Sequence, residues 1–185
     1  MSALVETAAT PNPDALMFRT DELLIPSGTV EVRRGGRVDD APLAAQLLRQ
    51  DGVELVLIAP RFVTVRKQAG ADWAWLEPQV RASLEAFLDS GEMAVYEDLA
   101  ANAAVERSDV EQRILALLEE EIRPAIAQDG GDVIYLGFAE GTLRLRLIGS
   151  CGTCPSSITT LKQGIERLLM EEVPEVREVI NEAAA

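Results

Sequence analysis

The amino-acid sequence predicts an α+β protein made of two small α+β domains joined by an alanine-rich linker. Three observations support this prediction: both halves mix strand-like and helical apolar patterns, an alanine-rich stretch separates them, and each half has its own apolar residues. A chain of 185 residues, 48% of them hydrophobic, is long enough for one domain or two small ones. We place the first domain at residues 8–98, the linker at 99–107 and the second domain at 108–182.

The first domain combines short apolar, β-branched segments with segments whose apolar residues recur every three or four positions. The former are typical of strands and the latter of amphipathic helices. Trp73 and Trp75 open the last of the helices, and at least one of these rings is expected to pack against the domain. The predicted elements are a turn at Pro11-Asn12-Pro13-Asp14, strands at 15–18 and 30–33, a helix from Pro42 to Asp51-Gly52, a hairpin of strands 54–58 and 62–65, and a helix over about 73–88.

The second domain begins with Ser108-Asp109-Val110-Glu111, a capping box in which the Ser108 side chain accepts from the Glu111 N–H while the Glu111 side chain reaches back. A helix is expected to start there. Pro124 kinks it or ends its regular part, and Asp129-Gly130-Gly131 terminates it. A hairpin of strands 133–138 and 142–148, a helix after Pro155 and a short strand at 175–180 follow. The domain is therefore predicted to be a helix–hairpin–helix unit.

The second strand of this hairpin has the alternation of a half-buried strand. Leu143, Leu145 and Leu147 alternate with Arg144 and Arg146. Since successive side chains of a strand point to opposite faces, the leucines are expected to face the core and the arginines the solvent. The strand leads directly into the two cysteines.

Composition excludes several classes of function. The chain has no histidine, so it lacks Ser/His/Asp and Cys/His catalytic arrangements and His-ligated zinc. Its net charge of −14, with lysine only at Lys67 and Lys162, argues against nucleic acid as a partner. There is no apolar run of about 20 residues to cross a membrane and no basic, apolar leader, so we expect a cytoplasmic protein. Thiols stay reduced in the cytosol, which makes the two cysteines metal ligands or redox groups.

The reactive residues are concentrated in Gly149-Ser150-Cys151-Gly152-Thr153-Cys154-Pro155. This CxxC pair lies at a predicted turn from a strand to a helix N-terminus. Two intervening residues allow both sulfurs to meet one metal or each other, and Gly152 imposes little constraint on the backbone between them. The positive end of the helix dipole favours the thiolate form, which is both the nucleophile and the metal ligand.

Three interpretations of the CxxC pair are open: a thioredoxin-like redox pair, a metal site and inert thiols. The redox interpretation is weakened because a thioredoxin-type unit needs further strands after its active-site helix, and only a short segment follows Met170. A metal site meets a shortage of ligands, since zinc and iron–sulfur sites commonly use four and one chain supplies two. Two chains that share the site across a two-fold axis would supply Cys₄. Such a site lies near solvent and is suited to delivery.

A resemblance to a known family distinguishes among these interpretations. The chain resembles the Nfu iron–sulfur proteins: residues 107–182 are similar to the NifU-like C-terminal domain, and the first half is similar to the family's N-terminal domain. The residues that carry the resemblance are Gly130-Gly131-Asp132-Val133, Gly137-Phe138, Gly149 to Ser157, Thr160 to Glu166 and Val173-Pro174-Glu175-Val176 in the second half, and Ala9 to Phe18, Asp51-Gly52-Val53 and Phe62-Val63-Thr64-Val65 in the first.

The resemblance implies a scaffold or carrier, which we expect to be cytosolic and not an enzyme. It would bind a [4Fe-4S] cluster between two subunits, with Cys151 and Cys154 of each as ligands, receive the cluster from upstream assembly proteins and pass it to apo-proteins as a homodimer. Two alternatives remain. One is a thiol–disulfide oxidoreductase with Cys151 as the attacking and Cys154 as the resolving thiol, and the other is a Cys₄ zinc-bridged dimer.

Overall fold

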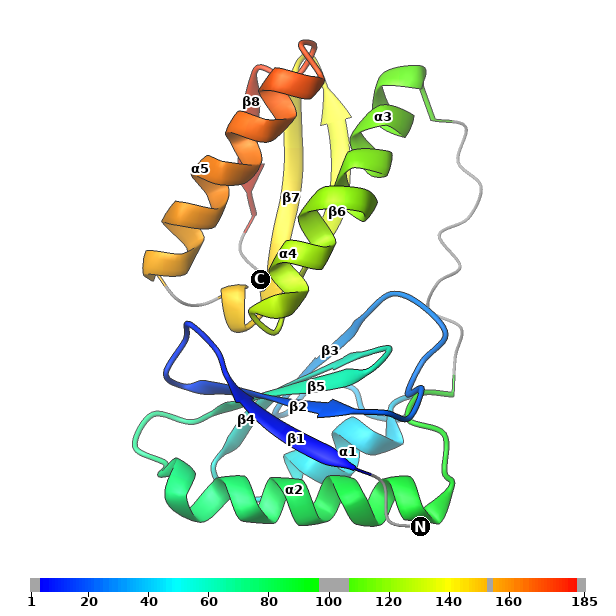
Figure 1. The fold of residues 1–185 in the computed structure, drawn as a ribbon, viewed down its shortest axis with the longest axis vertical. Coiled ribbons are helices and arrows are strands. Elements are labelled where there is room, and N and C mark those ends of the chain that lie inside the picture. The colour runs from blue at the N-terminus through cyan, green and yellow to red at the C-terminus, as the bar shows by residue number, and fades with distance from the viewer. Residues whose placement is uncertain (1–3, 97–106, 153–154, 183–185) are drawn as a thin grey trace. The chain divides into compact units, whose positions relative to one another are not determined.

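The structure, a computed structural model, describes residues 4–96, 107–152 and 155–182, with the side chains of 155–161 left out of the description. The chain divides into two compact units, Met1–Asn102 and Ala103–Ala185, each of which mixes helices and strands (Figure 1). The predicted α+β class is confirmed. Of the predicted linker, 99–107, only Arg107 lies within the described residues.

The first unit is built on a five-stranded antiparallel sheet with the strand order β1-β2-β5-β4-β3. The sheet and two helices include every element predicted for this half, in the predicted order. Their bounds are β1 Val5–Ala9, β2 Ala15–Thr20, β3 Val30–Arg33, α1 Pro42–Leu48, β4 Val53–Ala59, β5 Phe62–Lys67 and α2 Trp73–Ser90.

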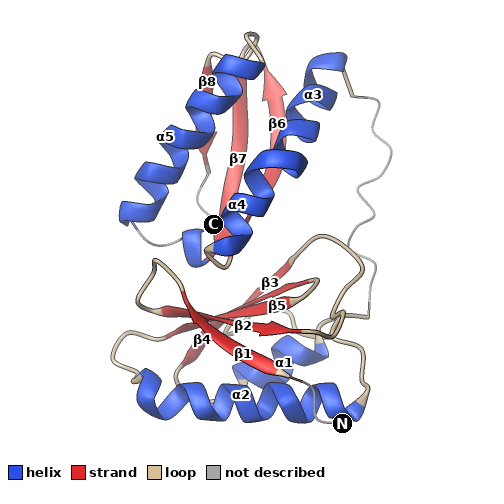
Figure 2. Ribbon diagram, in the orientation of Figure 1, coloured by secondary structure: helices blue, strands red, loops and turns tan. Residues whose placement is uncertain are grey.

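Helices α1 and α2 cover one face of this sheet (Figure 2). The fully buried side chains of the two helices recur every three or four residues. They belong to one apolar core with Phe18, Val56 and Val65 of the strands. The Asp72 side chain caps α2 by accepting from the Ala74 N–H, and Gly91 ends it in the left-handed conformation. The core of the first unit therefore lies between the helices and this face of the sheet.

Strand β1 was not among the predicted elements. It forms the edge of the sheet and pairs antiparallel with β2, from Val5 opposite Thr20 to Ala9 opposite Leu16. Of its side chains only Val5 is buried. Val5 and Thr7 are β-branched, but an edge strand with one buried side chain lacks the apolar alternation that identifies strands in a sequence.

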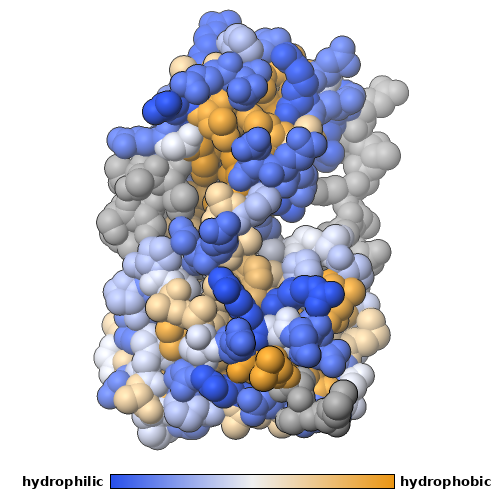
Figure 3. All heavy atoms as spheres, in the orientation of Figure 1, coloured by the Kyte–Doolittle hydropathy of each residue, from blue (hydrophilic) through white to orange (hydrophobic). Residues whose placement is uncertain are grey.

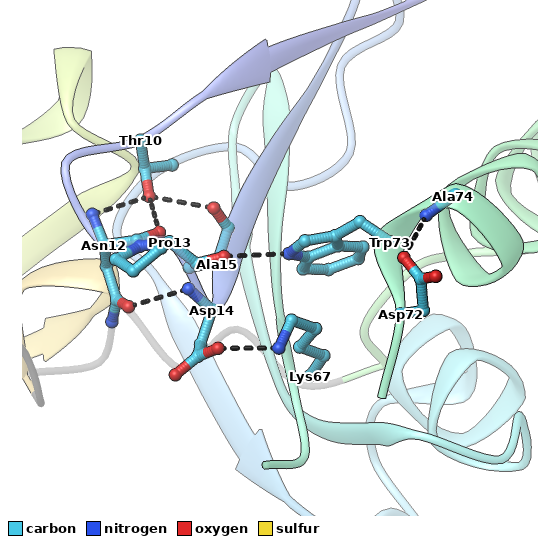
Figure 4. A network of polar contacts seen from close by, with 9 residues as sticks. All are labelled: Thr10, Asn12, Pro13, Asp14, Ala15, Lys67, Asp72, Trp73 and Ala74. Atoms are coloured by element: carbon cyan, nitrogen blue, oxygen red, sulfur yellow. Dashed lines mark hydrogen bonds and ion pairs between the residues drawn. The ribbon is translucent and has the colours of Figure 1, made fainter. Parts of the chain in front are cut away.

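The turn between β1 and β2 is tied to the rest of the first unit by polar contacts (Figure 4). The Trp73 indole Nε1 donates to the Pro13 carbonyl at 3.0 Å. Lys67 Nζ on β5 lies 2.7 Å from Asp14 Oδ1. Trp73 also packs against the apolar core, as predicted for one of the two tryptophans, whereas Trp75 is 56% exposed.

The second unit has a three-stranded sheet with the order β6-β7-β8. Strands β6 and β7 form an antiparallel hairpin, and β8 adds in parallel to β7 after the crossover through α5. The elements are α3 Asp109–Leu117, the π-helical turn Leu118–Ile122, α4 Arg123–Gln128, β6 Gly131–Ala139, β7 Thr142–Gly149, the 3₁₀ turn Ser150–Gly152, α5 Pro155–Glu172 and β8 Glu178–Asn181.

Local signals in this half are confirmed by the structure. Ser108 Oγ accepts from the Glu111 N–H, and a Glu111 carboxylate oxygen accepts from the Ser108 N–H at 2.9 Å, which completes the capping box. The regular helix ends at Leu117, and the wider π turn that follows leads to Pro124, which has no N–H to donate to the Glu120 carbonyl.

Strand β7 places its leucines in the core, as its sequence predicts. Leu143, Leu145 and Leu147 are buried in the apolar core of the second unit, and Arg144 is exposed, whereas Arg146, which was also expected to face the solvent, is half-buried. This core lies between the sheet and helices α3, α4 and α5. None of the helices in the described residues is both long and apolar enough to span a bilayer.

Candidate metal centre

Two turns meet at one end of the β6–β7 hairpin. Residues 129–130 link α4 to β6, and the 3₁₀ turn Ser150–Gly152 follows β7. The register pairs Gly131 with Gly149, so the start of one strand lies beside the end of the other. Gly130 and Gly149 have φ values of 73° and 71°, a left-handed conformation that glycine adopts without strain. The backbone thus changes direction at both places, and the turn that carries Cys151 lies against the end of α4.

Cys151 is fixed in this position by its contact with Gly131. A Cβ atom on Gly131 would lie 2.8 Å from Cys151 Sγ and 2.9 Å from the Ile148 carbonyl oxygen. Only a glycine leaves room for the sulfur there. The sequence predicted Gly131 as part of a helix terminator and missed this second role, although Gly130 alone supplies the left-handed residue.

The Cys151 side chain is only 1% exposed, whereas a sulfur near solvent was expected. It belongs to the same apolar core as Ile126, Leu147 and Ile165. Figure 3 shows apolar side chains gathered between α4 and α5, where Ile122, Ala125, Ile126, Gly164, Ile165 and Leu168 line a hollow. The difference arises because the exposure of a turn depends on packing by distant elements, which a local pattern does not report.

Ser150 joins the two turns. Its backbone N–H donates to the Gly130 carbonyl at 3.3 Å, and its hydroxyl donates to the Asp129 carbonyl. The same hydroxyl oxygen lies 3.6 Å from Cys151 Sγ. Sequence reasoning did not single out Ser150, whose position immediately before the first cysteine was the available signal.

Gly152 is constrained more tightly than the sequence suggested. A Cβ atom on Gly152 would lie 2.9 Å from the Leu147 carbonyl oxygen, which is a backbone atom and cannot turn aside. The sequence indicated only the backbone freedom of this glycine, and the structure adds that the position has no room for a side chain. Its role is to allow the 3₁₀ turn to approach the end of β7.

Asp132, the residue after Gly131, places a buried carboxylate beside this end of the hairpin. Its Oδ1 accepts from the Val133 N–H at 2.7 Å and lies 3.6 Å from Arg123 Nε. Arg123 also donates to the Val133 carbonyl at 3.3 Å and pairs with Glu119 at 3.2 Å. Arg123 is the first residue of α4, so its contacts with Asp132 and Val133 hold α4 against the first residues of β6.

The second predicted ligand, Cys154, lies outside the described residues. Among the side chains that the structure describes, no three His, Cys, Asp or Glu lie together in a way that could hold a metal ion. Thiolate sulfur is nevertheless the ligand that iron–sulfur clusters use, and a chain without histidine has no nitrogen alternative to it. The Cys151 thiol is therefore a suitable ligand for an iron–sulfur cluster. A complete set of four ligands requires further cysteine sulfurs.

Comparison with known proteins places the chain among its relatives. The family model "NifU-like domain" matches residues 114–180, and the model "Scaffold protein Nfu/NifU N terminal" matches residues 5–91. The chain is 40% identical over 178 residues to the human "NFU1 iron-sulfur cluster scaffold homolog, mitochondrial", an alignment that covers 95% of this chain and 70% of that protein. The chain belongs to the Nfu/NifU family. The resemblance seen in the sequence is thereby confirmed.

One further relative and one solved structure are also similar to this chain. The protein of the same name from Drosophila erecta is 38% identical over 183 residues, which are 96% of this chain and 64% of that protein. The chain thus spans slightly less than two thirds of this relative's length. The solution structure of a NifU-like protein from Saccharomyces cerevisiae is similar with a TM-score of 0.48 and 26% identity, covering 52% of this chain and 87% of that one.

The predicted cytoplasmic location is contradicted by these relatives. The human and Drosophila members of the family are both named as mitochondrial. The prediction depended on the absence of an apolar run and of a basic, apolar leader. These features concern membrane spans and secretory leaders, and they do not distinguish the cytosol from the mitochondrion.

Proposed function

We propose that this chain is an iron–sulfur cluster scaffold and carrier, not an enzyme, that holds a cluster and passes it to apo-proteins. The observation that carries the proposal is the place of Cys151, in a turn that two glycines and a serine fix between β7 and α5. Membership of the Nfu/NifU family supports it, because relatives over most of the chain are named iron–sulfur cluster scaffolds.

We further propose that Cys151 and Cys154 of two subunits together bind a [4Fe-4S] cluster. Such clusters are held by four cysteine thiolates, and one chain has two cysteines in all. A two-fold axis through the cluster supplies the remaining ligands from an identical surface. The loaded form is then a homodimer with the cluster at the CxxC turns.

The burial of Cys151 bears on how the cargo is loaded and released. A sulfur that is 1% exposed must turn outward before it can share a cluster with a second chain. The turn that carries it is short and lies at the end of a strand, so this movement does not require the sheet to open. Loading from upstream assembly proteins and delivery to apo-proteins both use the outward position.

Anaerobic reconstitution with iron and sulfide tests this proposal. We expect about four iron and four sulfide per two chains, together with a change from monomer to dimer on gel filtration. Cys151→Ala and Cys154→Ala should each lose the cluster, while Ser90→Ala in the first unit should keep it. An equal yield of cluster in either cysteine variant would contradict the proposal.

The same samples test the two alternatives. A thiol–disulfide oxidoreductase would reduce insulin disulfides catalytically without bound iron. A Cys₄ zinc dimer would contain about one zinc per two chains and no sulfide. Transfer is tested by mixing the loaded protein with an apo-ferredoxin and following the acceptor's spectrum. A scaffold without carrier function would keep its cluster in that experiment.

A further inference from the structure

Ser150 connects three groups at the cysteine turn. Its hydroxyl and its backbone N–H bind the carbonyls of Asp129 and Gly130, which belong to the turn between α4 and β6. The hydroxyl oxygen also lies 3.6 Å from Cys151 Sγ. Ser150 is itself buried, so these contacts are made away from competing water.

The directions of these hydrogen bonds follow from counting hydrogens. A serine hydroxyl has one hydrogen, and a carbonyl oxygen can only accept. The hydroxyl hydrogen therefore points to Asp129, and in the contact with Cys151 the thiol donates to the serine oxygen. A thiol bound to iron has lost this hydrogen and can no longer donate. The Cys151–Ser150–Asp129 arrangement thus belongs to the metal-free chain.

We propose that Ser150 is a positioning residue that latches Cys151 in its buried place beside Gly131 until the sulfur binds metal. The latch keeps the thiol of the metal-free chain away from solvent, and it opens when the sulfur turns outward. Its role in cluster loading rests on the proposed function, whereas its effect on the exposure of Cys151 does not. The two are therefore tested separately.

The first test needs no cluster. In a Cys154→Ala chain, Cys151 is the single thiol, and its rate of alkylation by iodoacetamide reports how often it becomes exposed. Loss of one buried hydrogen bond should raise this rate about tenfold in Ser150→Ala. Ser150→Thr keeps the hydroxyl and should restore a rate near the parent's. An unchanged rate in Ser150→Ala would overturn the latch.

A matched control separates the latch from a general loss of stability. Ser90 Oγ also donates to a backbone carbonyl, that of Phe87 at 2.6 Å, but lies at the end of α2 in the first unit. Ser90→Ala should leave the alkylation rate unchanged. Urea unfolding of each variant supplies the second measurement. If the faster alkylation of Ser150→Ala is fully accounted for by its lower free energy of unfolding, the latch is also overturned.

The second test follows cluster formation in chains that keep both cysteines. With the latch removed, Ser150→Ala should load iron and sulfide several-fold faster than the parent, and Ser150→Thr should load at the parent's rate. Equal loading rates in Ser150→Ala and the parent would show that the latch does not control loading. If no variant and no parent chain holds a cluster, the proposed function fails, while the alkylation result still decides whether Ser150 positions Cys151.

Discussion

The backbone of Gly131 lies directly against the sulfur of Cys151, although the two residues are separated by a complete hairpin. The space that a Cβ would need is occupied by Cys151 Sγ at 2.8 Å and by the Ile148 carbonyl at 2.9 Å. The second of these atoms is part of β7 and cannot rotate away. The first residue of β6 therefore packs directly against Cys151.

Gly131→Ala should therefore displace Cys151. Overpacking at a buried position typically costs about 1–3 kcal/mol, and here the displaced group is the candidate ligand. We expect a lower free energy of unfolding in urea and, in a Cys154→Ala chain, faster alkylation of Cys151, because its buried place is no longer available. Gly164→Ala is the control, because none of the described side chains lies within 4 Å of its added Cβ. That variant should be as stable as the parent or more so, since alanine favours helices. An unchanged alkylation rate in Gly131→Ala would contradict the assigned role.

Gly152→Ala tests the other side of the turn. Its Cβ would lie 2.9 Å from the Leu147 carbonyl, so the 3₁₀ turn must shift away from the end of β7. The variant keeps both thiols yet should load clusters poorly, which separates ligand placement from ligand number. Iron and sulfide analysis after anaerobic reconstitution measures the effect, with a count of reactive thiols in denaturant as the control. Parent-like loading would show that the position of the turn is not important.

The hydrogen bond between Tyr135 and Glu111 predicts a pH-dependent stability of the second unit. The Tyr135 hydroxyl on β6 donates to Glu111 Oε1 at 2.7 Å. The pKa of Glu111 is lowered first by the Ser108 N–H and then by Tyr135, whose own pKa is raised by burial and by the carboxylate. Because the folded carboxyl binds its proton less tightly than the unfolded one, the contribution is present above the ordinary value of 4.5 and is lost as the pH falls through the lowered pKa.

Glu111→Gln should accordingly flatten the fall in stability on acidification, and Tyr135→Phe should flatten it in part. Urea unfolding at neutral pH and near pH 3, followed by a probe in the second unit, measures the slope. Tyr96→Phe provides the comparison, because its hydroxyl makes a similar contact with Glu92 at 2.9 Å in the first unit. A Glu111→Gln chain with the parent's acid dependence would exclude this carboxylate as its source.

Features that depend on residues close together in the sequence were predicted correctly, whereas features that depend on the pairing of distant segments were missed. The capping box of Ser108 and Glu111 is local, and the period of two in β7 directly reports which side chains are buried. Strand β1 was missed because it joins the sheet mainly through its backbone. The burial of Cys151 against Gly131 was missed because it depends on the pairing of β6 with β7. Local patterns could thus be predicted from the sequence, but the packing around Cys151 could not.

The contact of Trp73 with the β1–β2 turn predicts unequal roles for two neighbouring tryptophans. Trp73 Nε1 donates to the Pro13 carbonyl at 3.0 Å, and its ring packs against the core, whereas Trp75 is 56% exposed on the same helix. Trp73→Phe removes the donor and keeps an aromatic ring, so the first unit should lose about 1 kcal/mol. Trp75→Phe should change the stability by less than about 0.5 kcal/mol. Urea unfolding of the first unit compares the two variants, and an equal effect would mean that the indole contact does not hold the turn in place.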